Sequence, residues 1–499
     1  MSLINIQNLT FGYDGSYENV FENVNLQLDT SWKLGLTGRN GRGKTTLMKL
    51  LMGELEYKGK ITSTADFEYF PYYPDSNELV INIIWELAPG AEEWEMRREL
   101  SMLDADSDLL YRPFSTLSNG EQTKVLIVGM FMRENSFLLI DEPTNHLDTH
   151  ARRVLAEYLG RKSGYILISH DRDFLDACVD HILVISKCSI EVSKGNFSTY
   201  DENRRRQEQF ETVQNERLKR EISQLEKAAK QAASHSEKIA STKIGIDPIK
   251  TEKSLTRRDS VSKKAAKLMN RAKNMEAHIE RDIEEKSGLL KNVEKNLSLK
   301  ISPLKYHSSR LIACRNLSLS YGDSLIFGNV SFTLDSGERI ALRGKNGCGK
   351  SSLIKLITGE ITDYSGEIFM GSRLKISYVC QSADSLCGSL DDYISEYGID
   401  GALFRAILCK LNFSSELFFR RIESYSQGQK KKVMLARSLS EQAHLYIWDE
   451  PLNYIDIMSR MQIEELLKNS DAAMIFVEHD SHFCDTIATK QIFMDNGAV

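Results

Sequence analysis

Short apolar runs and amphipathic stretches alternate through both halves of this 499-residue chain. Runs such as Phe137-Leu-Leu-Ile and Tyr165-Ile-Leu-Ile are hydrophobic throughout, which is the pattern of strands buried on both faces of a sheet. Residues 3–28 alternate apolar and polar positions around a turn, which predicts further strands. Leu445-Tyr-Ile-Trp448 repeats the buried pattern in the second half. We therefore expect an α/β fold in each half.

Two longer amphipathic stretches separate the halves. Apolar residues recur mostly at three- and four-residue steps over 210–232 and again over 265–297. Gly245 and Pro248 interrupt the pattern between them. Such stripes bury each other as an antiparallel helical hairpin, about 50 Å long at a rise of 1.5 Å per residue. The predicted domains are residues 1–200, a hairpin linker at 201–305 with its tip near 241–262, and residues 306–499.

A glycine-rich loop lies between a predicted strand and a predicted helix in each half. The first, Gly38-Arg-Asn-Gly-Arg-Gly-Lys-Thr-Thr46, recurs 306 residues later as Gly344-Lys-Asn-Gly-Cys-Gly-Lys-Ser-Ser352, so the chain is an internal duplication. The glycines allow backbone N–H groups to face a chain of phosphates, and the lysine and hydroxyl suit terminal phosphates and Mg²⁺. The expected phosphate-binding residues are Gly38, Asn40, Gly41, Gly43, Lys44, Thr45, Thr46, Gly344, Asn346, Gly347, Gly349, Lys350, Ser351 and Ser352.

Paired carboxylates end a buried strand in each half, as Asp141-Glu142 and Asp449-Glu450. The first carboxylate of such a pair can hold Mg²⁺ through water, and the second can orient and deprotonate an attacking water. His170 and His479 end the next apolar strands, from where each could sense a terminal phosphate. A histidine at a strand end is more often structural, so both alternatives stay open.

Composition and charge narrow the class of protein. No run approaches the roughly 18 apolar residues of a membrane helix, and the first residues lack the pattern of a signal peptide. The eight cysteines form no C-x-x-C pair, which predicts reduced thiols and a cytoplasmic protein. Residues 201–300 carry 24 Lys and Arg against 17 Asp and Glu, although the whole chain has a net charge of -6. A basic segment between acidic halves indicates contact with a polyanion.

The order of these motifs resembles an ATP-binding cassette domain, a kind of P-loop NTPase. The run Glu142-Pro-Thr-Asn-His-Leu-Asp148 resembles the soluble F class, whose members lack membrane domains. The signature motif of the family is matched by Leu117-Ser-Asn-Gly-Glu-Gln122 and by Tyr425-Ser-Gln-Gly-Gln429. The resemblance covers nearly the whole chain, and the loop lysine precedes the signature serine by 74 residues in one half and 76 in the other. It implies two tandem cassettes joined by a helical hairpin, with no membrane subunit. It also implies an ATPase, producing ADP and phosphate, whose cassettes pair within one monomer over two ATP molecules.

The resemblance implies roles for particular residues. Glu142, Glu450, His170 and His479 would be catalytic. Ser118 and Gly120 would bind the ATP held by Lys350, and Ser426 and Gly428 the ATP held by Lys44. Tyr13 and Tyr321 would stack on adenine, although a tyrosine packed within a strand explains them equally well from sequence alone. The Mg²⁺ ligands would be Thr45, Asp141, Ser351, Gln381 and Asp449.

The two halves depart from the family pattern in different ways. Tyr72 stands where the first half should have the glutamine that Gln381 supplies in the second. Metal coordination therefore differs between the halves, and we expect the two sites to hydrolyse ATP at different rates.

The linker tip is strongly basic, because residues 241–275 contain ten basic and three acidic residues. Such a charge run is often only a solvated loop. In the F class, however, this linker enters the tRNA exit site of the bacterial large ribosomal subunit, which implies contact with ribosomal RNA and P-site tRNA. The residues expected to bind RNA are Lys243, Lys250, Lys253, Arg257, Arg258, Lys263 and Lys264.

Two runs resemble the Lsa-type antibiotic-resistance branch of the F class. They are Trp32-Lys-Leu-Gly-Leu-Thr-Gly-Arg-Asn-Gly-Arg-Gly-Lys44 and Tyr446-Ile-Trp-Asp-Glu-Pro-Leu-Asn-Tyr454. That resemblance implies displacement of lincosamides, pleuromutilins and streptogramin A compounds from the peptidyl-transferase centre, with ATP hydrolysis driving release from the ribosome. One alternative is a housekeeping translation factor of the F class without a drug role. A second is the ATPase subunit of an exporter.

Overall fold

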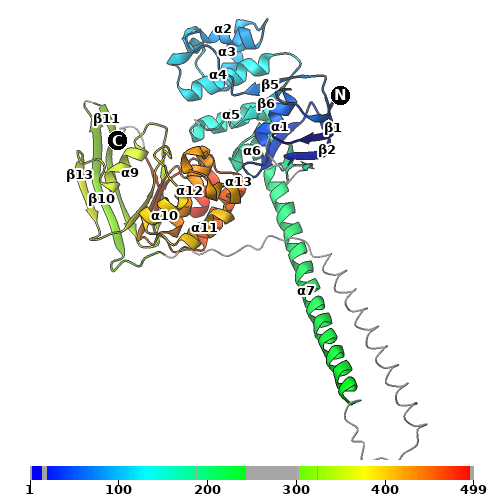
Figure 1. The fold of residues 1–499 in the computed structure, drawn as a ribbon. Helices are drawn as coiled ribbons and strands as arrows, with labels where there is room; N and C mark the ends of the chain where they lie inside the picture. The colour runs from blue at the N-terminus through cyan, green and yellow to red at the C-terminus, as the bar shows by residue number, and fades with distance from the viewer. Residues whose placement is uncertain are drawn as a thin grey trace, which may run out of the picture. The chain divides into compact units, whose positions relative to one another are not determined.

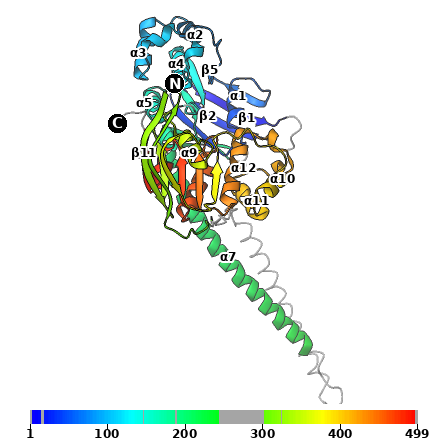
Figure 2. The same ribbon diagram turned by 90° about the vertical axis from the view of Figure 1, so that its left-hand side faces the viewer.

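The computed structural model describes residues 3–13, 19–145, 147–186, 189–242, 301, 303–322 and 324–494. The chain divides into two units, residues 1–200 with 297–499 and residues 201–296. The first unit holds two similar halves, each with a small antiparallel sheet, a larger mainly parallel sheet and helices (Figures 1 and 2). The α/β fold predicted for each half is confirmed.

The first half contains two sheets. Three antiparallel strands form the smaller one, in the order β2-β1-β4, and six strands form the larger one, in the order β5-β6-β7-β3-β8-β9. All neighbours in the larger sheet are parallel except β8 and β9. The strands are β1 (Leu3–Phe11), β2 (Phe21–Asp29), β3 (Lys33–Gly38), β4 (Lys58–Thr62), β5 (Asp66–Phe70), β6 (Ser136–Asp141), β7 (Tyr165–Ile168), β8 (His181–Ile185) and β9 (Ile190–Lys194).

The helices of the first half fall into two groups. Helices α2, α3 and α4 gather at one end of it, away from the small sheet (Figure 1). The helices are α1 (Lys44–Leu51), α2 (Val80–Leu87), α3 (Glu93–Met102), α4 (Asn119–Met132), α5 (Thr149–Arg161) and α6 (Arg172–Cys178), with 3-10 turns η1 (Ser107–Tyr111) and η2 (Phe114–Thr116). Strand β3 leads directly into the loop before α1, as the sequence pattern predicts.

The second half repeats this topology with orders β11-β10-β13 and β14-β15-β16-β12-β17. Its strands are β10 (Arg310–Tyr321), β11 (Ser324–Asp335), β12 (Arg339–Arg343), β13 (Ser365–Met370), β14 (Ile376–Val379), β15 (Leu445–Asp449), β16 (Met474–Val477) and β17 (Lys490–Phe493). Its helices are α9 (Lys350–Thr358), α10 (Leu390–Tyr397), α11 (Gly401–Lys410), α12 (Gln427–Ser440), α13 (Ile457–Lys468) and α14 (Ser481–Ile487), with 3-10 turns η3 (Ser415–Phe419) and η4 (Ile422–Ser424).

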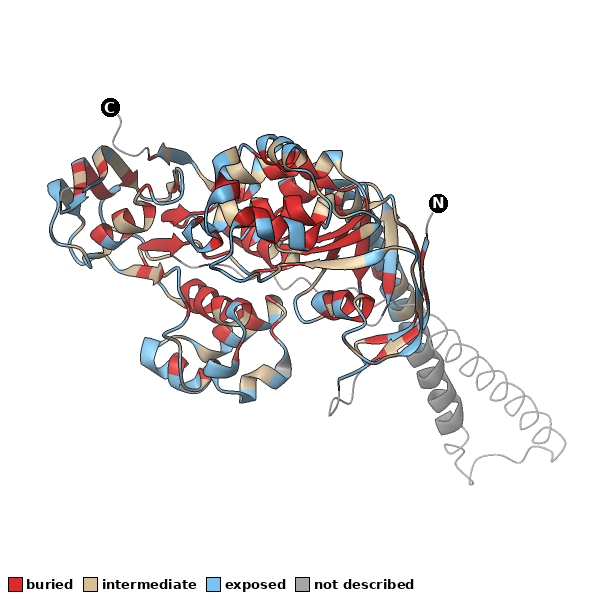
Figure 3. Cartoon of the chain, turned by 90° about the horizontal axis from the view of Figure 1, so that it is seen from above, coloured by how far each residue is buried: buried red, intermediate tan, exposed pale blue. Residues whose placement is uncertain are grey.

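Buried side chains concentrate on the central strands and the helix faces that cover them (Figure 3). Strand β15 is buried along its whole length, and β7 likewise. Such strands sit between two helical layers, so both of their faces need apolar residues. Within each sheet, the parallel strands end at the same edge. The residues that follow these strands therefore lie close together there.

Helix α7 (Phe197–Thr242) is 46 residues long and contains the first amphipathic stretch expected of the linker. Leu218, Ile222 and Leu225 are half-buried along it, whereas Phe210 and Val213 are exposed. The second stretch, the hairpin turn and all seven basic residues assigned to the tip lie outside the described residues. In the described part of the chain, no helix has the length and apolar character needed to span a bilayer.

Candidate functional site

Each glycine-rich loop ends in a glycine that no other residue can replace without strain. Gly43 has φ 93°, and a Cβ on it would lie 2.5 Å from Val20 Cγ1. Gly349 has φ 89°, and a Cβ there would lie 2.6 Å from Ile326 Cγ2. Both α1 and α9 begin at the lysine that follows. Local sterics therefore place the lysine and the next hydroxyl in the first turn of a helix, where free N–H groups attract anions.

The two loop lysines are buried and fold back over their own loops. Lys44 Nζ donates to Gly38 O at 2.8 Å and to Asn40 Oδ1 at 3.0 Å. Lys350 Nζ donates to the backbone oxygens of Gly344 and Lys345 at 2.9 and 2.8 Å. Burial lowers the pKa of Lys44, and nearby carboxylates oppose this. Each loop thus encloses the amino group of its own lysine within hydrogen bonds to loop oxygens.

The hydroxyl after each lysine meets the aspartate that ends β6 or β15, a strand two places away in the sheet from the strand before the loop. Thr45 Oγ1 donates to Asp141 Oδ2 at 3.1 Å, and the Tyr69 hydroxyl donates to the same oxygen at 3.1 Å. Burial raises the pKa of Asp449, and a hydrogen bond from Ser351 opposes the increase. Hydroxyl and carboxylate oxygens are donors that Mg²⁺ accepts, with water completing its shell. The oxygen donors in both halves therefore fit this ion.

The glutamate after each aspartate adopts a left-handed backbone conformation, with φ 52° at Glu142 and 47° at Glu450. A non-glycine residue pays roughly 1–3 kcal/mol for such a conformation, which is found mostly at functional sites. Both glutamate N–H groups donate to the neighbouring strand, at Ile168 O and Val477 O. The strain therefore aims two equivalent carboxylates out of the sheet edge.

The first glutamate is poorly supported. Glu142 Oε1 is buried and accepts no hydrogen bond from the described residues, although His170 Nε2 lies 3.3 Å away. Burial and the adjacent Asp141 raise the pKa of Glu142 to about 8. Burial also holds the pKa of His170 well below its ordinary value.

The second glutamate is held by several neighbours. Gln381 Nε2 and Asn453 Nδ2 donate to Glu450 Oε2 at 2.9 and 2.8 Å, and His479 Nε2 lies 3.4 Å from Oε1. Burial would raise the pKa of Glu450, but the interactions with His479 and Gln381 outweigh it and lower the pKa to about 2. Glu450 is therefore ionised and oriented before any nucleotide arrives.

Tyr72 does not substitute for the missing glutamine. Its hydroxyl donates to Glu86 Oε1 at 2.7 Å, on helix α2, and not to Glu142. The replacement of the glutamine by Tyr72 therefore removes a hydrogen-bond donor from Glu142 that Glu450 has in Gln381.

Both signature motifs begin a helix through the same capping pattern. The Ser118 hydroxyl accepts from the N–H of Glu121, and that of Ser426 accepts from the N–H of Gln429. Gly120 and Gly428 follow in the first turn of α4 and α12, where unpaired N–H groups lie.

One hydrogen bond connects the first glycine-rich loop with the segment after Glu450, which lies beside the second signature motif. Asn40 Nδ2 donates to Tyr454 O at 3.0 Å. A Cβ on Gly428 would lie 3.5 Å from Asn40 Nδ2 and 2.6 Å from Tyr454 O, so only glycine fits there. The loop around Lys44 and the helix after Ser426 therefore approach each other.

The two tyrosines proposed to face adenine are both half-exposed. The Tyr13 hydroxyl lies 2.9 Å from Thr46 Oγ1, which ties the ring to the first loop. Tyr321 ends β10 and is 55% exposed. An exposed ring face is what stacking on a base requires.

Sequence reasoning missed three residues that the structure adds. Asn453 donates to the Glu450 carboxylate, and Tyr69 donates to the strand-ending Asp141. Lys431 Nζ donates to the backbone oxygens of Cys380 and Glu450 at 3.2 and 3.1 Å. Asn453 lies inside a motif and offered a signal, whereas Lys431 and Tyr69 became visible only through the fold.

The chain matches the ABC transporter family twice, over residues 21–145 and 327–453. The ribosome protection protein VmlR of Bacillus subtilis (strain 168) is 25% identical over 506 residues, covering 98% of this chain and 86% of its own. ABC transporter F family member 2 of Arabidopsis thaliana is 24% identical over 557 residues, covering 99% and 77%. Among solved structures, the archaeal ribosome recycling factor aABCE1 in complex with the stalk protein aP1 matches with a TM-score of 0.63 at 18% identity, covering 97% and 87%.

Proposed function

This chain belongs to the ABC transporter family and is an ATPase, and from this premise we propose that it is an F-class protein acting on the bacterial ribosome. It binds the tRNA exit site of the large subunit when both cassettes hold ATP. The observation that carries the proposal is the long helical segment between two complete ATPase halves, matched along nearly the whole chain by relatives that include a ribosome protection protein.

The ATP sites provide the switch in this proposal. The glycine-rich loops bind the phosphates, with Lys44 and Lys350 at their centres, and the opposite signature helix completes each site. Thr45 and Asp141 in one site, and Ser351, Asp449 and Gln381 in the other, would hold Mg²⁺, which would supply positive charge next to the phosphates. A helix N-terminus favours the γ-phosphate, so ATP stabilises the closed state better than ADP does.

Hydrolysis then resets the protein. Glu450 orients a water molecule and accepts its proton, with Gln381, Asn453 and His479 fixing the carboxylate. Glu142 has the same role in the other site, where His170 Nε2 lies 3.3 Å from its Oε1. Loss of the γ-phosphate removes the charge that the signature helix recognises, so the cassettes separate and the protein leaves the ribosome.

The linker contacts RNA in this proposal. Residues 201–300 carry the excess of basic residues, and lysine and arginine bind the phosphate backbone. At its tip, Lys243, Lys250, Lys253, Arg257, Arg258, Lys263 and Lys264 contact ribosomal RNA and P-site tRNA. The finer part of the proposal is that the tip displaces lincosamides, pleuromutilins and streptogramin A compounds, as in the Lsa-type branch.

Co-sedimentation with purified bacterial ribosomes tests the central claim. The Glu142→Gln, Glu450→Gln double variant should close on ATP without resetting, so it should pellet with ribosomes in ATP but not in ADP. Lys44→Ala, Lys350→Ala serves as the matched control, because it should not close and should stay in the supernatant with either nucleotide. Equal pelleting of the glutamate variant with and without ATP would sink the proposal.

Drug susceptibility of a strain expressing the protein separates the finer claim from a housekeeping role. Replacing residues 244–258 with a Gly/Ser segment of equal length should abolish protection while leaving ATPase activity unchanged. Full protection by this variant would remove the tip from the mechanism. Unchanged susceptibility with the wild-type chain would leave a translation factor without a drug role.

A further inference from the structure

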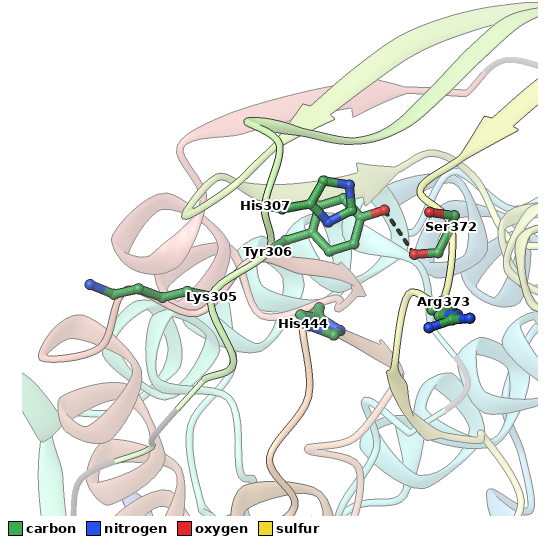
Figure 4. A pocket seen from close by; sticks show the side chains of 6 residues that line it. All are labelled: Lys305, Tyr306, His307, Ser372, Arg373 and His444. Carbon is green, nitrogen blue, oxygen red and sulfur yellow. Dashed lines mark hydrogen bonds between the residues drawn. The ribbon is translucent and has the colours of Figure 1, made fainter.

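A cavity of about 580 Å³ opens on the second cassette, away from the residues assigned to ATP. It is lined by Lys305, Tyr306, His307, Ser372, Arg373 and His444 (Figure 4). Three segments that are distant in sequence form it: the stretch entering the second cassette, the turn between β13 and β14, and the residue before β15. Four of the six lining side chains carry basic nitrogen groups, and no lining residue is acidic.

Two aromatic contacts build the floor of this cavity. The Tyr306 and His307 rings have centroids 4.1 Å apart, and the edge of His444 lies against Tyr306 at 5.3 Å. The Tyr306 hydroxyl donates to Ser372 O at 2.9 Å. A Cβ on Gly371 would fall 2.5 Å from the Tyr306 hydroxyl oxygen, so the turn accommodates this ring only because it has glycine there.

The backbone holds the rest of the cavity in place. Leu304 N–H donates to Ala443 O at 2.9 Å, which ties the entering segment to the start of β15. The N–H of Lys375 donates to His444 Nδ1 at 2.9 Å, so in the neutral form of the ring the hydrogen is on Nε2. Arg373 has φ 56°, a conformation that costs an arginine free energy and that is retained mostly at functional positions.

The charges on the rim have no acidic partner. Among the residues that the structure describes, neither Lys305 nor Arg373 has a carboxylate within ion-pair distance. In Figure 4 the Lys305 side chain extends to one side of the Tyr306 ring and Arg373 lies on the other. Two cations that flank an aromatic ring suit a ligand in which phosphates flank a planar base. A lone phosphate would match this arrangement less well.

The first cassette supplies an internal comparison. The strand registers place Asp66 and Ser136 where the second cassette has Lys375 and His444. Thr64 occupies the turn position of Arg373. The same backbone framework is therefore neutral or acidic in one cassette and basic in the other, so the fold does not require the basic residues.

We propose that this cavity, which we call the Tyr306 pocket, binds a single-stranded RNA segment, with phosphates at Lys305 and Arg373 and a base stacked on His307. Single-stranded RNA presents unstacked bases that aromatic residues bind, and its phosphates are spaced along the chain. His307, Ser372 and Arg373 are exposed, so a ligand belonging to a large RNA can reach them. The proposal rests on the ribosome as partner, to which it adds a contact on the second cassette.

Fluorescence anisotropy with 5′-labelled decauridylate tests the Tyr306 pocket. The full-length chain carries the Gly/Ser substitution of residues 244–258, to remove the linker tip, and ADP is present to occupy the ATP sites. Lys305→Gln, Arg373→Gln should bind about tenfold more weakly and reduce the slope of log affinity against log salt by about 1.4, at 0.7 per phosphate. His307→Ala should weaken binding about tenfold with little change in that slope.

Lys58→Gln, Lys60→Gln is the matched control, because it removes the same charge from exposed positions on β4. It should leave the affinity within about twofold of its parent. Equal losses in the two double variants would overturn the proposal, as would unchanged binding in both. Competition by UMP at the same phosphate concentration as the RNA would identify a free nucleotide as the ligand and also overturn it.

Failure of the proposed ribosome partner can be distinguished from failure of the proposed RNA site. If the glutamate double variant does not pellet with ribosomes but the Tyr306 pocket still binds decauridylate, the proposed partner is wrong and the pocket stands. If pelleting succeeds and the Tyr306 pocket variants bind RNA like their control, only the pocket is wrong. ATPase activity equal to that of the parent confirms that each variant is folded.

Discussion

The two ATP sites share a backbone and differ in how they support the glutamate. Glu450 accepts hydrogen bonds from Gln381 and Asn453 and faces His479, whereas Glu142 Oε1 accepts none from the described residues and faces His170. Duplication preserved the strained turn that aims each carboxylate, since both have φ near 50°. Among the described residues, side-chain amides hold only the Glu450 carboxylate ionised and oriented, so the two halves share a fold and differ in the surroundings of this glutamate.

The largest effect should come from removing the supported glutamate. We predict that Glu450→Gln lowers steady-state phosphate release on the order of 10³-fold, because a positioned general base typically supplies 10²–10⁴-fold. Glu142→Gln should lower it less than about threefold, because that carboxylate lacks the same support. Phosphate release by the two single variants at saturating ATP measures this. Equal losses in both would show that the sites turn over equally.

A second difference lies behind the active sites. Lys432 Nζ lies 2.9 Å from Asp456 Oδ2, with side chains 4% and 0% exposed. The equivalent Lys124 is only partly buried and donates to Asp104 O at 3.5 Å. Breaking a buried pair leaves an uncompensated charge.

We therefore predict that Lys432→Met lowers the free energy of unfolding of the second cassette by about 3–5 kcal/mol. The matched Lys124→Met should cost less than about 1 kcal/mol, because its charge already contacts water. Urea unfolding of both variants, followed by tryptophan fluorescence, measures the difference. A smaller loss for Lys432→Met than for Lys124→Met would contradict the comparison.

The smallest effect on activity should come from the position that holds Gln381 in the second half and Tyr72 in the first. Gln381→Tyr should lower phosphate release about tenfold, because Glu450 loses a hydrogen bond and the metal loses an amide oxygen. Tyr72→Gln should change release by less than about twofold, since the Tyr72 hydroxyl is bonded to Glu86 and not to Glu142. A Mg²⁺ titration of both variants separates the two causes. Activity gained by Tyr72→Gln would instead identify Tyr72 as the reason for the weaker first site.

The phosphate-binding loops, the signature helices and the paired carboxylates could be predicted from sequence because their chemistry depends on local spacing. Gly43 and Gly349 need a left-handed backbone beside a packed side chain, and Ser118 and Ser426 cap helices within four residues. Such constraints act over one turn of chain, so they are visible as motifs. The exchange of glutamine for Tyr72 was visible for the same reason.

Other features depend on contacts between distant segments. Tyr69 reaches Asp141 because β5 and β6 are neighbours, and Lys431 reaches the backbone of Glu450 from helix α12. The Tyr306 pocket joins residues up to 139 positions apart, from Lys305 to His444, none of which belongs to a motif. The linker tip remains a prediction from charge and resemblance.

The sequence by itself determined the two-cassette fold and the kind of chemistry, because burial periodicity and loop stereochemistry are local properties. Only the tertiary structure decided which glutamate is held by side-chain amides and where the Tyr306 pocket forms. Hydrogen bonds and charge interactions act across a few ångströms of space regardless of separation along the chain, so the fold must be known before their partners can be named.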